Sequence, residues 1–405
     1  MERRKVTYRL YPSKTQATAL ADLLRHHQQL YNACLEQRID AWRRAKVSVS
    51  YADQCAELTA LRRECPDWAV ANCSSQQITL RRLNKAFQAF FRRVKAGQTP
   101  GFPRFKSLKR FPGFGFKGHG DGWRFTPGAD WRHGKLRLQG VGLVKARGQP
   151  RQGGTIKSCE LMHEDGVWHL SLSLECPVIQ RRHGAESCAF DWGTETFLTL
   201  AVKTADADAH ETVANPRWFQ TARDRLGDLA RSVSRKKRGS NRRRKATKTL
   251  AREKRRVANR RKDWQHKISA ALIARFGLIA AETLSIQNLT RSAAGTVEEP
   301  GSNVKQKSGL NREILDTAPA QFYSMVRYKA ADAGSLFLEA PTRALKPSQR
   351  CPCCWSVVKK ALGERTHTCS ACGHTAPRDF TSARVVLRWA HDTLTSTGQE
   401  LSEAA

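Results

Sequence analysis

Hydrophobic and polar residues alternate at the start of the chain, where Val6, Tyr8 and Leu10 are separated by polar positions. Alternation with a period of two predicts a half-buried strand, which we place in residues 1–11. Ser13 and Gln16 then form a capping box, with a serine at the cap and a glutamine three positions later. The chain is therefore expected to pass from one strand directly into a helix.

Three amphipathic helices are expected in residues 12–96. In each of them apolar residues recur at three- and four-residue spacing, which places them on one face of a helix. Together the helices would form one small helical domain. The apolar positions of the three helices are Leu20, Leu23, Leu24, Leu30, Tyr31 and Cys34, then Tyr51, Cys55, Leu58 and Leu61, then Ile78, Leu83, Phe87, Phe90, Phe91 and Val94.

The pattern changes to β structure in residues 97–180. Glycine, proline and aromatic residues separate short alternating segments, such as residues 135–138 and 167–174. This composition is typical of antiparallel strands. If the first strand joins the same sheet, residues 1–11 and 97–180 form a β-barrel, and the helical domain of residues 12–96 is an insertion in it.

A third pattern begins at residue 184 and predicts an α/β domain. Residues 188–202 form two apolar strands joined at Gly193, and residues 276–286 form a buried strand that contains one carboxylate, Glu282. A helix in residues 319–333 and a strand in residues 335–339 are expected to follow. We further expect a mobile loop in residues 290–308 and a disordered tail in residues 396–405.

The charge of the chain indicates a polyanionic partner. Lys and Arg outnumber Asp and Glu by 71 to 36, which gives a net charge of +35. Such an excess repels itself unless a polyanion neutralises it, so nucleic acid is the favoured partner over an anionic membrane. No apolar run approaches the ~18 residues of a membrane span, and no apolar signal segment is seen at the start. A cytoplasmic location without membrane contact is expected.

The most concentrated positive charge lies in residues 223–262, where 19 of 40 positions are Lys or Arg and three are acidic. Like charges at four-residue spacing destabilise a helix, so we expect this stretch to be ordered mainly against phosphates. A solvated helical hairpin is the alternative. The expected nucleic-acid contacts of this stretch are Lys236, Lys237, Arg242, Arg243, Arg244, Arg256 and Arg260.

Basic residues and aromatics are interleaved in residues 101–116. Such surfaces stack bases on aromatic rings while cations hold the phosphate backbone. For Phe111, Phe114 and Phe116 the alternative is a place in the barrel core. The expected nucleic-acid contacts here are Arg104, Lys106, Lys109 and Arg110.

Three carboxylates interrupt apolar elements: Asp191, Glu282 and Asp379. Any one of them could be structural, since a strand aspartate can accept backbone hydrogen bonds and Asp379 can cap a helix. Their order is more specific, because a carboxylate on a first strand, another on a later central strand and a third at the start of a late helix is the arrangement of RNase H-like folds. Converging carboxylates need cations, and oxygen ligands favour Mg²⁺ or Mn²⁺. We therefore predict a catalytic metal site for phosphodiester hydrolysis, with two ions about 4 Å apart.

Two Cys-x-x-Cys pairs, Cys351–Cys354 and Cys369–Cys372, are separated by 14 residues. This is the spacing of a four-thiolate zinc ribbon, and a site closed by four thiolates is structural. The ribbon is expected to position the helix that carries Asp379. Seven further cysteines are scattered singly and are expected to be buried thiols rather than disulfides. The alternatives left open for a zinc ligand are Cys353 in place of Cys354 and, less favoured, His367 and His374.

Taken together, these motifs resemble the TnpB (OrfB) family encoded by insertion sequences, and the related compact type V CRISPR effectors. The resemblance spans nearly the whole chain. Two positions depart from the family pattern, with Thr381 where Asn is common and Trp355 where Gly is usual. The segments that carry the resemblance are Arg9–Pro12 with Gln16, Tyr31–Asn32, Gly101–Lys106, Asp191–Gly193, Ala281–Leu284, Pro347–Cys351, Cys369–Cys372 and Arg378–Asp379.

The resemblance implies an α/β multidomain fold. It consists of a wedge-like N-terminal β-barrel with an inserted helical recognition domain, then a RuvC-type nuclease domain in residues 184–346 and 375–395, split by a zinc ribbon in residues 347–374. The implied activity is Mg²⁺-dependent cleavage of double-stranded DNA beside a short flanking motif, in the bacterial cytosol or nucleoid. A guide RNA would select the target by base pairing, a division of labour known from another class of RNA-guided nuclease.

Other functions remain as alternatives. One is an RNA-guided DNA-binding repressor with weak or no cleavage, which the retained carboxylates argue against. A compact CRISPR effector has the same chemistry and differs in its neighbouring genes. A transposase that joins strands through a tyrosine or a DDE site is a further alternative. It accounts less well for an excess of positive charge of the kind that binds RNA. Homodimerisation on the RNA is left open.

Overall fold

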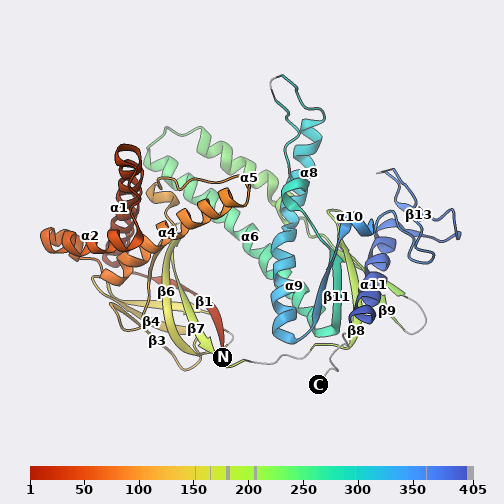
Figure 1. Ribbon diagram of the computed structural model, residues 1–405, viewed down its shortest axis with the longest axis horizontal. Coiled ribbons are helices and arrows are strands. Elements are labelled where there is room, and N and C mark those ends of the chain that lie inside the picture. Colours follow the sequence, from red (N-terminus) through yellow and green to blue (C-terminus); the bar gives the residue numbers. More distant parts are fainter. Residues whose placement is uncertain are drawn as a thin grey trace. The chain divides into compact units, whose positions relative to one another are not determined.

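The computed structural model (Figure 1) describes residues 1–150, 152–164, 166–178, 183–204, 208–296, 298–361 and 363–398. The chain divides into two compact units, Met1–Val178 and residues 179–405, each with its own hydrophobic core. Within the described ranges, none of the helices is long and apolar enough to cross a membrane.

The first unit contains one antiparallel sheet of seven strands in the order β2-β6-β7-β1-β5-β4-β3. The predicted N-terminal strand is confirmed and lies in the middle of this sheet, between β7 and β5. The expected β-barrel is confirmed in part: among the described residues the strands form a half-barrel, with β2 and β3 as the two ends of the strand order. The strands are β1 (Glu2–Tyr11), β2 (Gly113–Phe116), β3 (Trp123–Pro127), β4 (His133–Leu138), β5 (Gly142–Gly148), β6 (Thr155–Glu164) and β7 (Val167–Cys176).

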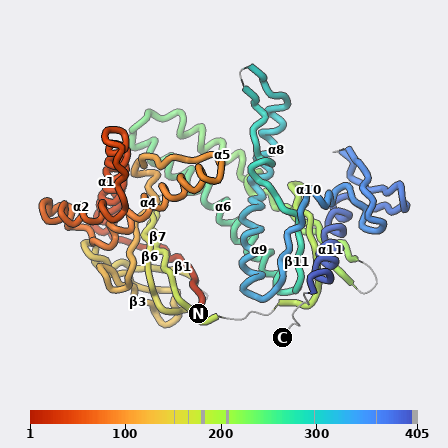
Figure 2. Tube along the Cα trace, viewed as in Figure 1, coloured from red at the N-terminus to blue at the C-terminus, as the bar shows by residue number. Residues whose placement is uncertain are grey.

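The helices of the first unit lie between β1 and β2 in the sequence (Figure 2). The predicted capping box is confirmed, since the Ser13 side chain accepts from the backbone of Gln16 and the Gln16 side chain accepts from the backbone of Ser13. Phe111, Phe114 and Phe116 are buried in the core, so the base-stacking interpretation is wrong for these three rings. The helices are α1 (Lys14–Ala45), α2 (Tyr51–Glu64), α3 (Pro66–Ala69), α4 (Cys73–Lys95) and the 3-10 turn η1 (Leu108–Arg110).

The second unit contains a mixed sheet of five strands in the order β10-β9-β8-β11-β12. The strands β10, β9 and β8 pair antiparallel, whereas β11 lies parallel to both β8 and β12. The predicted hairpin around Gly193 and the buried strand that contains Glu282 are both confirmed, although that strand ends at Glu282 and not at residue 286 as expected. The strands are β8 (Glu186–Trp192), β9 (Thr196–Lys203), β10 (Asp208–Ala214), β11 (Phe276–Glu282) and β12 (Leu336–Ala340), with a small separate hairpin of β13 (Thr366–Thr368) and β14 (Thr375–Pro377).

Helices cover both faces of this sheet, with α9 and α11 on opposite sides (Figure 1). Two predictions need correction: α8 begins at Val304, inside the expected loop, and α11 continues to Thr397, inside the expected tail. The remainder of that tail, from residue 399, lies outside the described residues. The helices are α5 (Trp218–Ser234), α6 (Asn241–Arg275), α7 (Ile286–Leu289), α8 (Val304–Thr317), α9 (Pro319–Ala333), α10 (Thr342–Leu345) and α11 (Arg378–Thr397).

Candidate active site and cysteine ribbon

The register of the second sheet brings Asp191 and Glu282 side by side. Strands β8 and β11 are parallel neighbours, and the pair Phe190 and Ala281 places the next residues of the two strands, Asp191 and Glu282, next to each other. Side chains alternate between the faces of a sheet. Both carboxylates therefore share the face of Ala189 and Ala280, which packs against α11.

Helix α11 supplies the third carboxylate to the same place. Asp379 lies in the first turn of α11. Its negative charge, like that of Glu282, raises the pKa of Asp191. Ser382, three residues further along the helix, donates a hydrogen bond of 2.8 Å from Oγ to Oε1 of Glu282. The three carboxylates of the sequence analysis thus converge from two strands and one helix, and all three are partly exposed.

Burial and mutual repulsion make this an electrostatically unfavourable place for negative charge. Burial raises the pKa of Asp191 well above its usual range, and the charges of Glu282 and Asp379 raise it further. Burial also raises the pKa of Glu282, although hydrogen bonds from Ser382 and Thr342 oppose the shift. Arg378 offsets part of the repulsion at Asp191. Carboxylates held together against their own repulsion are suited to divalent cations, which would neutralise them.

The oxygen-only donor set fits a hard cation such as Mg²⁺ or Mn²⁺. The three carboxylates offer six oxygen atoms between them, and two neighbouring ions can share such ligands.

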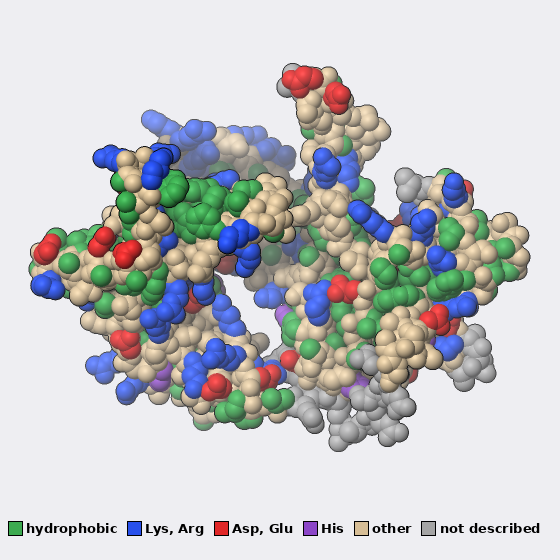
Figure 3. Space-filling view, viewed as in Figure 1, with side chains coloured by type: hydrophobic (Ala, Val, Ile, Leu, Met, Phe, Trp, Pro, Cys, Tyr) green, Lys and Arg blue, Asp and Glu red, His purple; other side chains and the backbone are tan. Residues whose placement is uncertain are grey.

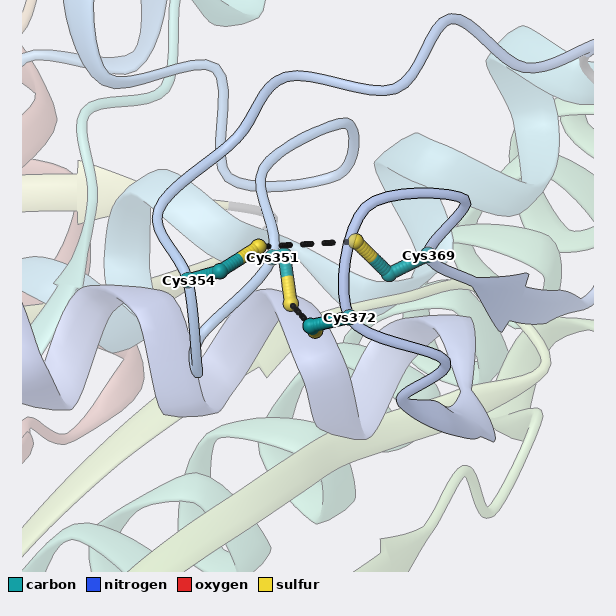
Figure 4. A group of neighbouring side chains, drawn as sticks. All are labelled: Cys351, Cys354, Cys369 and Cys372. Atoms are coloured by element: carbon teal, nitrogen blue, oxygen red, sulfur yellow. Dashed lines mark hydrogen bonds between the residues drawn. The ribbon is translucent and has the colours of Figure 1, made fainter.

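The four cysteines of the predicted ribbon converge as expected (Figure 4). The Sγ atoms of Cys351 and Cys372 are 3.6 Å apart, and those of Cys354 and Cys369 are 3.5 Å apart. Tetrahedral Zn–S bonds of about 2.3 Å put sulfur atoms about 3.8 Å from one another, so these residues fit a zinc ion. Cys353 is outside the group, and neither His367 nor His374 belongs to it.

Hydrogen bonds favour the thiolate form of one of these ligands. Bonds from the side chain and backbone of Ser356 lower the pKa of the Cys354 thiol to about 6. A thiolate is the form that binds metal. This environment distinguishes Cys354 from Cys353, whose thiol is held above its usual pKa mainly by burial.

The ribbon leads directly into the helix of the acidic site. Cys369 and Cys372 lie in the turn between β13 and β14, and β14 ends at Pro377, immediately before α11. Arg388 of α11 donates hydrogen bonds of 2.8 Å to the carbonyl oxygens of Pro352 and Cys353, next to the other cysteine pair. Both halves of the ribbon are therefore attached to α11, which supports the expected role of the ribbon in positioning Asp379.

Trp355 shows how this chain tolerates a departure from the family pattern. Its backbone has a φ of 68°, in the left-handed region where glycine is favoured. The ring is stacked by two guanidinium groups, with Arg350 at 5.2 Å and Arg388 at 4.6 Å from its centroid. These cation–π contacts offset the backbone strain of a bulky residue at this turn.

The predicted basic motif in residues 101–106 is fastened to α1. The backbone amide of Lys106 donates to Asn32 at 2.9 Å, and Gln28 and Asn32 donate to the Lys106 carbonyl. The Lys106 ammonium lies 5.8 Å from the Tyr31 ring centroid. The Tyr31–Asn32 motif therefore holds this loop in place, whereas Arg104, Lys109 and Arg110 remain exposed.

The basic stretch forms the helical hairpin α5–α6. Two of its expected nucleic-acid contacts instead hold the turn: Arg243 donates to the carbonyls of Val233 and Lys236, and Lys236 donates to Ser232. The expected contacts that are exposed are Lys237, Arg242, Arg244, Arg256 and Arg260.

Ser382 and Thr342 were not predicted from the sequence, although the Ser382 hydroxyl donates to Glu282 and the Thr342 hydroxyl donates to the carbonyl of the adjacent Thr283. The signal for Ser382 was present in the sequence, since it follows Asp379 at the three-residue spacing that places two side chains on one helix face. Thr342 carried no comparable signal.

The order of these features agrees with known families. The family model for the OrfB protein of IS605, described as "Probable transposase", matches residues 171–293, and the helix-turn-helix model of the same family matches residues 1–46. A protein of Escherichia coli (strain K12) named "Putative RNA-guided DNA endonuclease InsQ" is 32% identical over 322 residues, covering 78% of this chain and 74% of the relative. The chain belongs to the OrfB (TnpB) family.

Other comparisons of this OrfB-family protein extend the match. A model of the Cas12f1-like TNB domain matches residues 320–386, which include the four cysteines and Asp379. A Streptomyces pristinaespiralis protein named "Putative RNA-guided DNA endonuclease" is 29% identical over 393 residues, covering 95% of this chain and 89% of the relative. The solved structure of the mini-RNA-guided endonuclease CRISPR-Cas_phi3 covers 100% of this chain and 93% of its own, with a TM-score of 0.53 and 8% identity, which is a likeness of fold alone.

Proposed function

We propose that this OrfB-family protein is an RNA-guided endonuclease that cuts double-stranded DNA beside a short flanking motif. The observation that carries the proposal is the convergence of Asp191, Glu282 and Asp379 at one face of the second sheet. It is supported by two relatives that are named putative RNA-guided DNA endonucleases. A protein of this kind that no longer cleaves DNA would be expected to lack one of these carboxylates. The presence of all three therefore argues against a repressor that only binds DNA.

In this proposal Asp191, Glu282 and Asp379 hold Mg²⁺ or Mn²⁺. When bound, such ions supply an activated water and stabilise the leaving oxygen in phosphodiester hydrolysis, which leaves a 5′-phosphate. Ser382 fixes the orientation of Glu282 through its hydrogen bond. Because the three carboxylates are partly exposed, a phosphate of the DNA backbone has access to them.

The four cysteines hold Zn²⁺ as a structural ion in the same proposal. A closed set of four thiolates leaves no open position for substrate. What the ion adds is the folding of residues 351–372 into a rigid base for α11. The chemistry at the acidic site then depends on the ribbon only through the placement of Asp379.

The guide is tested by expressing the protein together with its native flanking DNA and sequencing the RNA that copurifies with it. One RNA of defined ends, encoded beside the gene, is the expected result. A random sample of cellular RNA would contradict guidance and leave a basic, nonspecific nucleic-acid-binding protein. Metal-dependent nicking separates the endonuclease from a repressor, which would bind the same target without cutting it.

A further inference from the structure

An apolar groove lies in the helical part of the first unit. It has a volume of about 1020 Å³ and is bounded by the end of α1, the segment that joins α1 to α2, the second half of α4, and Phe102. In Figure 3 hydrophobic side chains gather over α1 and α4, with Lys and Arg beside them. Its aromatic lining is Trp42, Tyr51, Phe87, Phe90, Phe91 and Phe102.

The aromatic side chains of the groove are unusually exposed. Trp42 is 56% exposed, Phe91 55% and Phe102 47%. Phe102 meets Phe87 and Phe90 edge-on, with ring centroids 5.7 Å and 5.3 Å apart. Clustered aromatic surface of this kind on a soluble protein marks a site that a partner covers.

The surroundings of the groove are strongly basic. Residues 38–53 and 84–102, which contain the whole lining, carry eight Lys or Arg and two acidic residues. Arg38 and Arg43 line the groove itself, and the guanidinium of Arg38 lies 5.2 Å from the Phe87 ring centroid. The last turns of α1 and α4 are also basic. Exposed rings among cations are complementary to a ligand that has both flat bases and phosphates.

We propose that this groove binds unpaired nucleotides of the RNA carried by the protein, with their bases stacked on Trp42, Phe91 and Phe102 and their phosphates held by the basic side chains around them. The inference rests on the proposed function, since it needs a resident RNA. RNA is favoured over target DNA because exposed aromatic surface requires an occupant that stays with the protein, and a target is bound only transiently. An apolar peptide or a second copy of the chain would not account for the positive rim.

The test separates aromatic stacking from mere apolar contact. The double variant Trp42→Leu with Phe91→Leu keeps an apolar groove but removes two flat rings, whereas Trp42→Phe with Phe91→Tyr keeps the rings. Leu143→Ala is the matched control, because Leu143 is 55% exposed on β5, outside the groove. Each full-length protein is mixed with the transcribed RNA that copurifies with the wild type. Affinity is measured by filter binding, and base accessibility by chemical probing at single-nucleotide resolution.

The leucine pair is expected to bind the RNA at least about 5-fold more weakly, the smallest effect of losing one stacked base, and to expose a short run of unpaired nucleotides to the reagent. The aromatic pair and Leu143→Ala are expected to match the wild type. Unchanged affinity and probing in the leucine pair would overturn the proposal while leaving RNA guidance intact. If the wild type carries no defined RNA, the proposed function fails and the groove assignment fails with it.

A second outcome would assign the groove to protein instead. Light scattering of the wild type and of Trp42→Glu with Phe91→Glu reports whether the groove joins two copies. The proposal is overturned if the wild type is a dimer, the glutamate pair is a monomer, and the RNA bases are equally accessible in the leucine pair and the wild type. The occupant of the groove would then be a second copy of the chain. A constant mass in both proteins, with altered RNA probing in the leucine pair, supports the proposal.

Discussion

The hydroxyl of Ser382 donates a hydrogen bond of 2.8 Å to the carboxylate of Glu282, although the two residues are 100 positions apart in the sequence. The contact joins α11 to the end of β11 and links two of the three acidic elements of the site. Next to it, Thr381 is 1% exposed, and its hydroxyl has no hydrogen-bond partner among the residues that the structure describes. Removing these two neighbouring hydroxyls is therefore expected to have different effects on cleavage.

Replacement of Ser382 by alanine should weaken cleavage. Loss of a hydrogen bond that orients a metal ligand typically lowers metal affinity or activity by about 10- to 100-fold. The measurement is the rate of plasmid cleavage as a function of Mg²⁺ concentration, and the half-maximal concentration should rise. Thr381→Val is the control and should cleave like the wild type, since removing an unsatisfied buried hydroxyl is close to neutral. Equal effects of the two substitutions would contradict the positioning role.

Replacement of Asp191 by asparagine should stabilise the metal-free protein while abolishing cleavage. The pKa of Asp191 is raised in the folded state, so its contribution to stability is present below its ordinary pKa and lost as the pH rises through the raised value. At neutral pH the charged carboxylate is destabilising, and the amide removes that repulsion. In buffer without added Mg²⁺ or Mn²⁺, the melting temperature of the second unit should rise by about 2–4 °C for each kcal/mol of repulsion removed.

The pH dependence provides the check on this explanation. The stabilisation by Asp191→Asn should be larger at pH 8 than at pH 4, because the wild-type carboxylate is increasingly protonated toward acid. Added Mg²⁺ should stabilise the wild type and have little effect on the variant. If the melting temperature of the variant is below that of the wild type at both pH values, Asp191 has a structural role.

The two adjacent cysteines Cys353 and Cys354 should differ completely in zinc binding. Cys354→Ser removes one of the four converging thiols, whereas Cys353→Ser leaves the group intact. Atomic absorption should find one zinc per chain in the wild type and in Cys353→Ser, and a loss of zinc in Cys354→Ser. Since metal binding and folding are coupled in such ribbons, Cys354→Ser should also become sensitive to proteases in residues 347–377. Zinc retained in Cys354→Ser but lost in Cys353→Ser would reverse the ligand assignment.

The basic hairpin should show two classes of arginine. Arg242→Ala should weaken nucleic-acid binding and lower the slope of log affinity against log salt by about 0.7–0.9 for one lost phosphate contact. Arg243→Ala should instead loosen the α5–α6 turn, because its side chain holds the carbonyls of Val233 and Lys236. Binding titrations at several salt concentrations, with circular dichroism as the fold control, separate the two. A salt slope changed equally by both substitutions would contradict this division.

Elements with a strong local signal could be predicted from the sequence. The strand around Tyr8, the capping box at Ser13 and the hairpin at Gly193 depend on neighbouring residues, so pattern and turn chemistry were sufficient. The β-barrel could be predicted only as a group of antiparallel strands, because no local pattern specifies how the distant edges β2 and β3 lie in the half-barrel. Helix α8 was missed because its first residues are polar and lack the apolar periodicity of a helix, so they resemble a loop.

The site was predictable where chemistry restricts residue type and not where it depends on geometry. Two Cys-x-x-Cys pairs and a carboxylate inside a buried strand are rare without a function, so these residues were found. The turn roles of Lys236 and Arg243 were missed because composition cannot separate an arginine that faces solvent from one that binds backbone carbonyls. The groove around Trp42 and Phe91 was missed for a similar reason, since its aromatic residues have the spacing of an ordinary buried helix face.

The most direct test of the account is guided cleavage by the purified protein with its copurified RNA. A plasmid library that carries the matching target beside randomised flanking sequence is incubated with Mg²⁺, and the cut molecules are sequenced. We predict double-strand cuts in molecules with one flanking motif, 5′-phosphate ends, and no cuts with Asp191→Ala, which should still bind the target. Cleavage that persists in Asp191→Ala, or that ignores the RNA sequence, would contradict the account.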